Sequence, residues 1–321
     1  MRHQVIEKLY DTIDEMAMLL VEHANLRYLD ALVGACANVM AADVLQEVDT
    51  ETEIKLFGLT KGLNEMAFNS EEVRKALQLS LLKGLKADRL PFGDMTPDGI
   101  AVLIGYLVEQ FKSDVSHLKI ADFVVGTGNL LTATLNGLKT PPASIYGVDV
   151  DYKVLELAKM MADMQDYDVQ FYQQSSTKSM NVPPVDVVIG DLPSGDGEAF
   201  VKEDSELGTA GCHYLPYLLV ENHLDYLDED GYGIFVIKND FFSQEHAAKL
   251  HEVITKKASI CMLLQLPESW FKSEEEGKSL LVVRRRSLNN EALVVSLPDF
   301  NNRKKMQSTL TKVEDWIKLN T

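Results

Sequence analysis

The sequence is poor in cysteine and histidine, and neither residue type is spaced as in a disulfide framework or a metal site. Its three cysteines, Cys36, Cys212 and Cys261, are far apart, and the seven histidines are scattered. An odd number of distant cysteines fits reduced thiols better than paired or metal-bound ones. We therefore expect a cytoplasmic protein without a metal site.

Long apolar runs are absent as well. No run reaches the roughly 20 residues that a membrane-spanning helix requires. The first residues include the charged Glu7, Lys8 and Asp11, where a signal peptide would be apolar. We expect no association with a membrane. With 321 residues, of which 46% are hydrophobic, the chain can bury the core of one large domain or two modest ones.

The sequence is also poor in positively charged residues. The formal net charge is −18, and a strongly acidic chain repels nucleic acid at long range. Basic residues concentrate only in segment 277–321. They could form a modest basic face. Alternatively, residues 284–286 protect the edge strand formed by the apolar run 279–283, which is the interpretation that we favour.

The first 90 residues predict helices, and the rest predicts a different architecture. Apolar residues between Leu19 and Val33 recur at helical spacing. Asn69 and Glu72 are spaced as in a capping box, which marks the start of a further helix. The loop at 90–94 is a plausible boundary. We therefore expect a helical domain at 1–92 and a second domain at 93–321.

The second domain is expected to open with a helix and to continue as an α/β fold. Thr96 is suited to an N-cap, Pro97 to the first helical turn and Asp98 to the positive end of the helix dipole. Strands and helices then alternate, which implies a mostly parallel sheet. The last two strands follow one another without a helix and should be antiparallel. Strands are expected at 120–125, 145–150, 169–172, 185–189, 233–237, 260–266 and 280–285, and helices at 129–137, 152–164, 214–227 and 244–255.

A glycine turn follows the first expected strand. Gly126 and Gly128 allow a tight turn and a close approach of the backbone to a ligand. Asp149 ends the second strand about 20 residues later and can accept hydrogen bonds from ribose hydroxyls, as in folds that bind adenosine-containing cofactors. The nicotinamide-binding pattern requires a third glycine where this chain has Leu131. A dinucleotide is therefore disfavoured, and a purely structural turn of another α/β protein stays open.

Asp122 lies four residues before Gly126, and this Asp-x-x-x-Gly-x-Gly pattern resembles motif I of class I S-adenosylmethionine-dependent methyltransferases. The run Gly-Thr-Gly-Asn-Leu-Leu is similar to that of N6-adenine methyltransferases and of the modification subunits of type I restriction systems. The resemblance implies S-adenosyl-L-methionine as cofactor. It also implies a seven-stranded, mostly parallel, doubly wound sheet with a terminal antiparallel strand. The binding residues would include Asp122, Gly126, Thr127, Gly128, Asn129, Leu130, Asp149 and Val150.

Two further segments fit the same resemblance. Thr96-Pro97 resembles motif X of N6-adenine methyltransferases, which would place these residues at the methionine part of the cofactor; a plain core-facing helix is the alternative. Gln174 and Ser175 follow the third strand, where the family usually has an acidic residue that binds the adenine. Their side chains could hydrogen-bond the adenine instead.

The catalytic motif is expected at the end of the fourth strand, where amino-methyltransferases have Asp/Asn-Pro-Pro-Tyr/Phe. Such a carboxylate, with the backbone carbonyl after it, accepts hydrogen bonds from an exocyclic amine and localises its lone pair toward the methyl group. Asp191, Leu192 and Pro193 would fill these positions. A plain Asx turn is the alternative.

Ser194 replaces the aromatic residue that stacks on a flipped base, and such stacking contributes about 1–3 kcal/mol. Phe200, His213 or Tyr214 could substitute for it. The sequence therefore predicts amino-group methyl transfer, with an adenine of weakly bound DNA as the implied acceptor. A degenerate, cofactor-binding interaction or regulatory protein, and a methyltransferase for RNA or for a protein glutamine, stay open. No oligomeric state is indicated.

Overall fold

The computed structural model describes residues 2–87, 95–112, 117–197, 202–271, 273, 276–286 and 291–320. Its contacts divide the chain into two compact units, each formed from separate segments. The first contains Met1–Met95, Gly126–Asn136 and Tyr152–Val169, and the second contains Thr96–Val125, Gly137–Asp151 and Gln170–Thr321. The boundary loop expected at 90–94 lies outside the described residues, and the division at residue 92 stays a prediction.

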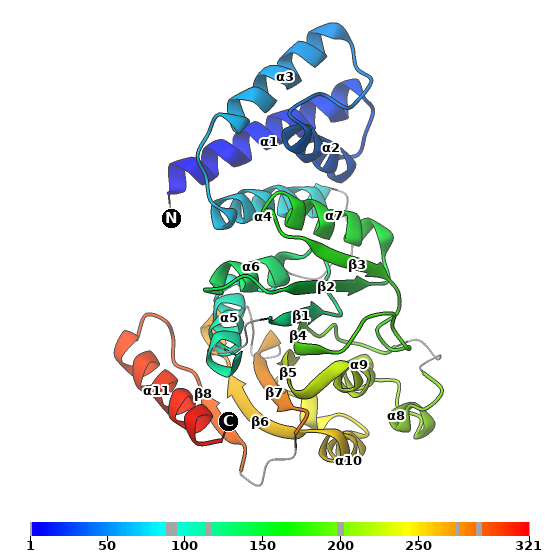
Figure 1. Cartoon of the computed structure of the whole chain (residues 1–321), viewed down its shortest axis with the longest axis vertical. Coiled ribbons are helices and arrows are strands. Elements are labelled where there is room, and N and C mark those ends of the chain that lie inside the picture. The colour runs from blue at the N-terminus through cyan, green and yellow to red at the C-terminus, as the bar shows by residue number, and fades with distance from the viewer. Residues whose placement is uncertain are drawn as a thin grey trace. The chain divides into compact units, whose positions relative to one another are not determined.

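The first unit is helical (Figure 1). Its apolar core includes Leu9, Ile13, Met16 and Leu20 of α1, together with Met161 of α7. The predicted capping box is confirmed, because Glu72 N donates to Asn69 Oδ1 over 2.9 Å and Asn69 N donates to Glu72 Oε2 over 3.2 Å. The helices are α1 (His3–His23), α2 (Tyr28–Ala41), α3 (Thr50–Asn64), α4 (Ser70–Ala87), α6 (Asn129–Gly137), whose last residue belongs to the second unit, and α7 (Tyr152–Asp163).

The second unit is built on an eight-stranded sheet with the order β3-β2-β1-β4-β5-β7-β6-β8 (Figure 1). β7 lies between β5 and β6 and is antiparallel to both, whereas β2, β1, β4 and β5 run parallel. The α/β class with a reversed strand near the C-terminus is confirmed. The strands are β1 (Lys119–Asp122), β2 (Ser144–Asp149), β3 (Val169–Gln173), β4 (Val185–Asp191), β5 (Leu227–Lys238), β6 (Ser259–Gln265), β7 (Lys278–Arg284) and β8 (Leu293–Ser296).

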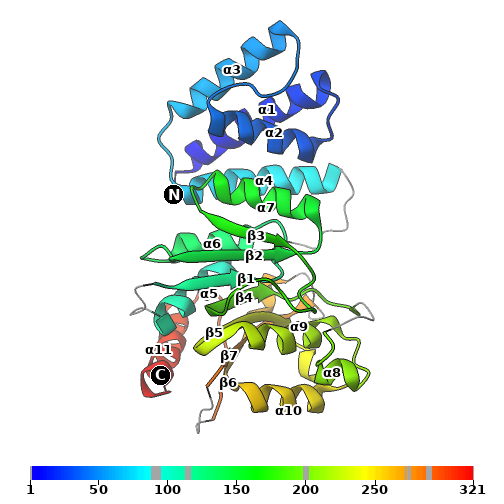
Figure 2. The ribbon, with the colours of Figure 1, turned by 45° about the vertical axis from the view of Figure 1, so that its right-hand side comes forward.

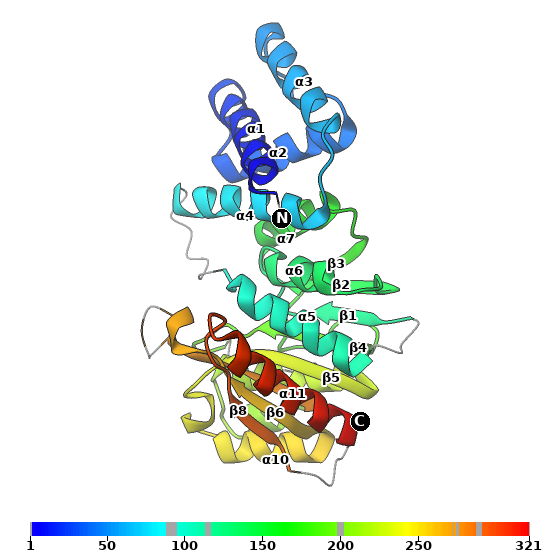
Figure 3. The same ribbon diagram turned by 90° about the vertical axis from the view of Figure 1, so that its left-hand side faces the viewer.

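Helices cover both faces of this sheet. α5 and α11 lie along one face (Figure 3), where Tyr106 donates to Glu314 over 2.8 Å. α9 and α10 pack on the other face (Figure 2), and their buried side chains include Tyr217 and Ile254. The helices are α5 (Asp98–Lys112), α8 (Glu206–Thr209), α9 (Leu215–His223), α10 (Ala247–Lys257) and α11 (Arg303–Asn320), with short 3-10 turns η1 (Leu224–Tyr226), η2 (Phe241–Ser243) and η3 (Glu268–Trp270).

Several local expectations were wrong. The helix expected to reach residue 227 ends at His223, and the strand expected at 233–237 is longer, because β5 spans Leu227–Lys238. β5 begins at Leu227, and an irregularity in its pairing with β4 accommodates the extra residues before Tyr232. The periodicity of the sequence did not reveal β8 or α11. Helix α5 begins at Asp98, one residue later than a Thr96 N-cap implies.

The expected edge strand at 279–283 was also wrong. β7 is an interior strand, because it pairs with β5 on one side and with β6 on the other. Arg284 is only 6% exposed and donates to Asp230 Oδ1 over 3.1 Å. The arginine therefore anchors the end of β7 rather than protecting an edge.

Candidate functional site

Three carboxylates lie at the carboxyl ends of adjacent parallel strands. Asp122 ends β1, Asp149 ends β2 and Asp191 ends β4. β1 lies between β2 and β4 in the sheet, and Asp122 is level with Gly147 and Ile189. Asp149 and Asp191 therefore lie two residues beyond it on either side. The carboxyl edge of an open α/β sheet is the usual place for a ligand site.

Asp122 is buried and only partly satisfied. Its side chain is 1% exposed, Oδ1 accepts a hydrogen bond from Val124 N over 3.0 Å, and Oδ2 has no partner among the described residues. Burial raises the pKa of Asp122 to about 8, the negative charges of Asp149 and Asp191 add to this effect, and the Val124 N–H opposes it. A ligand that donates hydrogen bonds or brings positive charge would satisfy the free oxygen.

A backbone hydrogen bond of Asp149 connects the end of β2 to the residue that follows β3. Its backbone carbonyl accepts from Gln174 N over 3.0 Å, and its Oδ1 accepts from Asp151 N over 3.0 Å. The Gln174 side-chain oxygen accepts from Asn181 N over 3.1 Å, while Nε2 is buried without a partner in the described part of the chain. The Ser175 hydroxyl contacts Thr177. The sheet therefore brings Asp149 and Gln174 together, whereas the side chain of Val150 is 62% exposed.

Asp191 is held by two side chains from distant segments. Thr96 Oγ1 donates to Asp191 Oδ2 over 2.9 Å, and Lys278 Nζ lies 2.8 Å from Oδ1 and 2.9 Å from Oδ2. The Thr96 side chain thus contacts the predicted catalytic carboxylate. Lys278 is the residue that the sequence analysis missed. Its only signal was its place at the head of the apolar run that forms β7.

The residues after Asp191 leave the sheet. Leu192 N donates to Val236 O over 3.1 Å, and the Leu192 side chain is buried. Pro193 and Ser194 are exposed. Asp196 forms an isolated antiparallel bridge with Tyr214. This bridge holds Tyr214, one of the residues that could substitute for the missing aromatic residue, close to the motif. Phe200, another of them, lies outside the described residues.

The glycine turn that follows β1 belongs to the helical unit. Gly126 and Gly128 have positive φ angles of 54° and 77°. A Cβ on Gly128 would lie 3.2 Å from the Cα of Ala158 in α7, so both the conformation and the space require glycine. Thr127 is partly buried in the same turn. Pro97, which the same resemblance assigned to the cofactor site, follows Thr96 in the second unit.

The first residues of α6 are buried within the helical unit. Asn129 is 3% exposed and Leu130 is 5% exposed. Asn129 Oδ1 accepts from Arg74 Nη1 over 2.7 Å, and Arg74 is itself 1% exposed. This contact was not predictable from the sequence, because Arg74 and Asn129 lie in different segments of the chain. Arg74 fixes the start of the helix that follows the glycine turn.

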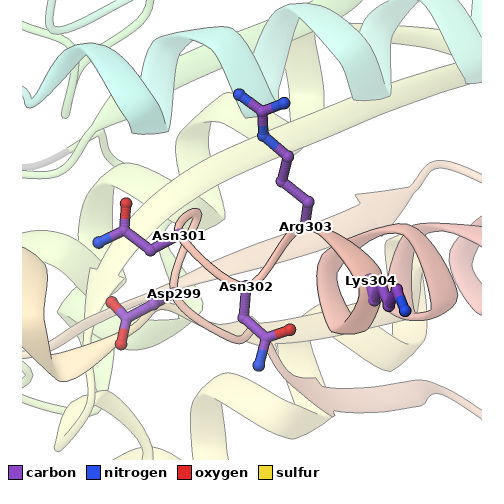
Figure 4. Close-up of a pocket in the computed structure, with 5 residues that line it drawn as sticks. All are labelled: Asp299, Asn301, Asn302, Arg303 and Lys304. Carbon is purple, nitrogen blue, oxygen red and sulfur yellow. The ribbon is translucent and has the colours of Figure 1, made fainter.

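A surface pocket lies away from the predicted residues, at the start of α11 (Figure 4). Figure 4 shows Arg303 directed toward α5, while Asn301 and Asn302 point in different directions. None of the predicted cofactor or catalytic residues lines it. The lining residues are Asp299, Asn301, Asn302, Arg303 and Lys304.

In the part of the chain that the structure describes, no three His, Cys, Asp or Glu side chains gather as a metal site would require. No described helix combines the length and the apolar character needed to cross a membrane.

The doubly wound sheet, the reversed β7 and the carboxylates at the ends of β1, β2 and β4 define a methyltransferase fold. Residues 93–317 match the model of the N-6 DNA Methylase family, and residues 7–85 match the YtxK N-terminal helical domain. The chain belongs to the N-6 DNA methylase family.

Three proteins illustrate what the chain is similar to. The uncharacterized protein YtxK of Bacillus subtilis is 32% identical over 99% of both chains. A Listeria monocytogenes protein assigned to the class I S-adenosylmethionine-dependent methyltransferases has 29% identity and a TM-score of 0.87, covering 98% of this chain and 100% of its own. The methyltransferase subunit of a type I restriction-modification system from Streptococcus thermophilus shares the fold, with 12% identity and a TM-score of 0.65 over 90% of this chain and 70% of its own.

Proposed function

We propose that this protein is an S-adenosylmethionine-dependent methyltransferase that acts on an amino group, of the N6-adenine DNA type. The observation that carries the proposal is the position of Asp191 at the end of β4, beside Asp122 and Asp149 at the ends of the adjacent strands. This arrangement supports the proposal, because a carboxylate that could accept from a substrate amine lies on a strand adjacent to one whose end could bind a cofactor.

The residues present fit the cofactor. S-adenosylmethionine carries a positive sulfonium and an ammonium group, and it supplies an electrophilic methyl group when bound. The partnerless Oδ2 of buried Asp122 suits a cationic or hydrogen-bond-donating group. Asp149 would accept from the ribose hydroxyls, and the unpaired Nε2 of Gln174 would donate to the adenine ring. Thr96, Pro97, Ser175 and Val150 complete the proposed set within the second unit. The turn from Gly126 to Leu130, which belongs to the helical unit, is proposed separately as a cofactor-binding turn.

Asp191 would hold the acceptor amine. A carboxylate that accepts an N–H bond draws the nitrogen lone pair out of conjugation and orients it. The backbone carbonyls of Asp191 and Leu192 can share this role, while Pro193 stiffens the segment. Adenine in DNA is the acceptor class that the family suggests. The net charge of −18 supports weak, salt-sensitive binding of duplex DNA.

The test is methyl transfer from radiolabelled S-adenosylmethionine to pools of DNA, RNA and protein. Wild-type protein should label an adenine-containing pool, and Asp191→Ala should abolish labelling while cofactor affinity by calorimetry stays nearly unchanged. The pools of RNA and protein test the alternative acceptors, an RNA base or a protein glutamine. Transfer that survives Asp191→Ala intact would refute the role given to this carboxylate.

A second candidate is a cofactor-binding regulatory or interaction protein without turnover. The exposed Ser194 at the position of the aromatic residue favours it. The experiment that separates the two adds the missing ring. Ser194→Tyr should raise affinity for single-stranded adenine by tenfold or more if stacking is the main defect, since a stacked base contributes about 1–3 kcal/mol. Ser194→Ala is the control. A regulatory protein should gain nothing from the tyrosine.

The three thiols support our proposal of a cytoplasmic location. Cys36, Cys212 and Cys261 are buried and form no disulfide. Three unpaired cysteines support a reducing compartment, and we place the protein in the cytoplasm on that ground.

A further inference from the structure

Lys278 is anchored by the backbone on both sides. Leu266 N donates to the carbonyl of Lys278 over 3.1 Å, and Asn239 N donates to the carbonyl of Gly277 over 2.9 Å. Lys278 is also the first residue of the reversed strand β7, paired with Lys238 at the end of β5. Because β7 runs opposite to β4 and β5, its beginning lies at the sheet edge where they end. The lysine is thus fixed at the site by the pairing of the strands.

The ammonium of Lys278 bridges the two oxygens of Asp191. The distances of 2.8 Å and 2.9 Å are nearly equal, so one cation engages the whole carboxylate. Thr96 takes a further position on Oδ2. A carboxylate offers about four acceptor positions in total. Lys278 and Thr96 together therefore occupy most of the acceptor positions on Asp191 that a substrate amine would need for its hydrogen bond.

The positive charge of Lys278 strengthens its hold on Asp191. A neutral exocyclic amine donates a weaker hydrogen bond than an ammonium does, because the bond from an ammonium to a carboxylate is charge-assisted. The pair is also partly shielded from solvent, with side-chain exposures of 26% for Lys278 and 16% for Asp191. In direct competition for Asp191, the lysine should prevail over a nucleobase amine.

We propose that Lys278 closes the acceptor site to neutral amines by occupying the position on Asp191 that a substrate amine requires. In this arrangement the site rejects neutral amines that cannot displace the ammonium. The inference deepens the second candidate function, a cofactor-binding protein without turnover, and it takes Asp191 as the residue at the position of the acceptor carboxylate. Lys278 acts through Asp191 and is assigned no step in a transfer reaction.

The experiment compares binding of two single-stranded oligonucleotides to full-length protein saturated with S-adenosylhomocysteine. One contains a single adenine, and the other has purine in its place, which lacks only the amine. The ratio of the two affinities, measured by fluorescence anisotropy at low salt, isolates the contribution of the amine. The ratio should be close to one for the wild type. It should rise about tenfold in Lys278→Met, because a hydrogen bond to a charged acceptor is regained.

Three variants serve as controls. Lys238→Met makes the same chemical change at the paired residue and should behave as the wild type. Lys278→Arg keeps the charge and should also keep the ratio near one. Asp191→Ala combined with Lys278→Met should lose the gain, because no side-chain acceptor for the amine is left. Lys278→Gln gives a second neutral variant, and thermal melting establishes that each protein is folded.

The outcomes are distinct. A high ratio in the wild type, or an unchanged ratio in both folded neutral variants, would overturn the role of Lys278 while leaving the proposed function intact. A gain that persists in the double variant would overturn it as well. Failure of the wild type to bind S-adenosylhomocysteine in calorimetry would instead remove the proposed function, and this inference with it.

Discussion

The guanidinium of Arg74 donates through Nη1 to Asn129 Oδ1 over 2.7 Å, while Nε and Nη2 each donate to Glu71 over 2.7 Å. Asn136 Nδ2 adds a bond to Glu71 over 3.0 Å. One buried arginine thus ties helix α4 to the start of α6 within the helical unit.

Arg74→Met should be strongly destabilising. The change removes the guanidinium that donates to both Glu71 and Asn129, and breaking one partner of a buried pair costs about 3–5 kcal/mol. Because Glu71 is 32% exposed, we expect a loss near the lower end of that range. Arg27→Met is the control, since Arg27 pairs with Asp30 at the surface and should cost about 1 kcal/mol or less. Urea unfolding measures both, and equal losses would contradict the role of Arg74.

Gly128→Ala should destabilise the protein by about 1–3 kcal/mol. The φ angle of 77° disfavours a side chain, and the new Cβ would lie 3.2 Å from the Cα of Ala158. Gly58 in α3 is the matched control, because nothing lies within 4 Å of a Cβ placed there. Gly58→Ala should instead stabilise the helix by about 0.5–1 kcal/mol. Thermal melts should move in opposite directions, and parallel shifts would argue against the tight turn.

Asp122 should make stability fall as the pH rises. The ordinary pKa of an aspartate side chain is 3.8, whereas the pKa of Asp122 in the folded protein is about 8. A raised pKa means that the folded state binds the proton more tightly, so its stabilising effect is present below pH 4 and is lost by pH 8. Asp122→Asn cannot titrate. Its unfolding free energy relative to the wild type should therefore rise steadily between these limits, and curves that stay parallel would show that the carboxyl group is not perturbed.

Asp149→Ala should weaken binding of S-adenosylmethionine and S-adenosylhomocysteine by tenfold or more, because a charge-assisted contact to the ribose is lost. NAD should bind neither protein. Asp168→Ala removes an exposed carboxylate of the same type and should leave affinity unchanged. Calorimetry decides the matter: if both variants lost affinity equally, net charge rather than a specific contact would be responsible.

The features that were predictable from the sequence are those set by neighbouring residues. The capping box needs only Asn69 and Glu72, and glycine marks a positive φ by itself at Gly128. The alternation of strands and helices is also local, which is why the α/β class and the reversed strand were predicted correctly. The ends of β4, β2 and β1 then follow from the topology of such a sheet.

The contacts that were missed join distant segments. Nothing near Lys278 in the sequence shows that its side chain reaches Asp191, 87 residues earlier. The run of arginines after residue 283 suggests an edge strand by its charge, yet the pairing of β7 with β5 makes the strand interior. The helix expected to continue to 227 fails for a related reason: the strand pairing of Leu227 with Val185 overrides the helical preference of the preceding residues.

The interior position of β7 also has a consequence for biosynthesis. A chain made from its N-terminus completes β4 and β5 before β7 exists. Until β7 pairs with it, β5 presents an open edge of apolar residues that can capture a strand from another molecule. Premature termination ahead of residue 278 would therefore produce more than a loss of the acceptor site. It would release a chain prone to aggregation.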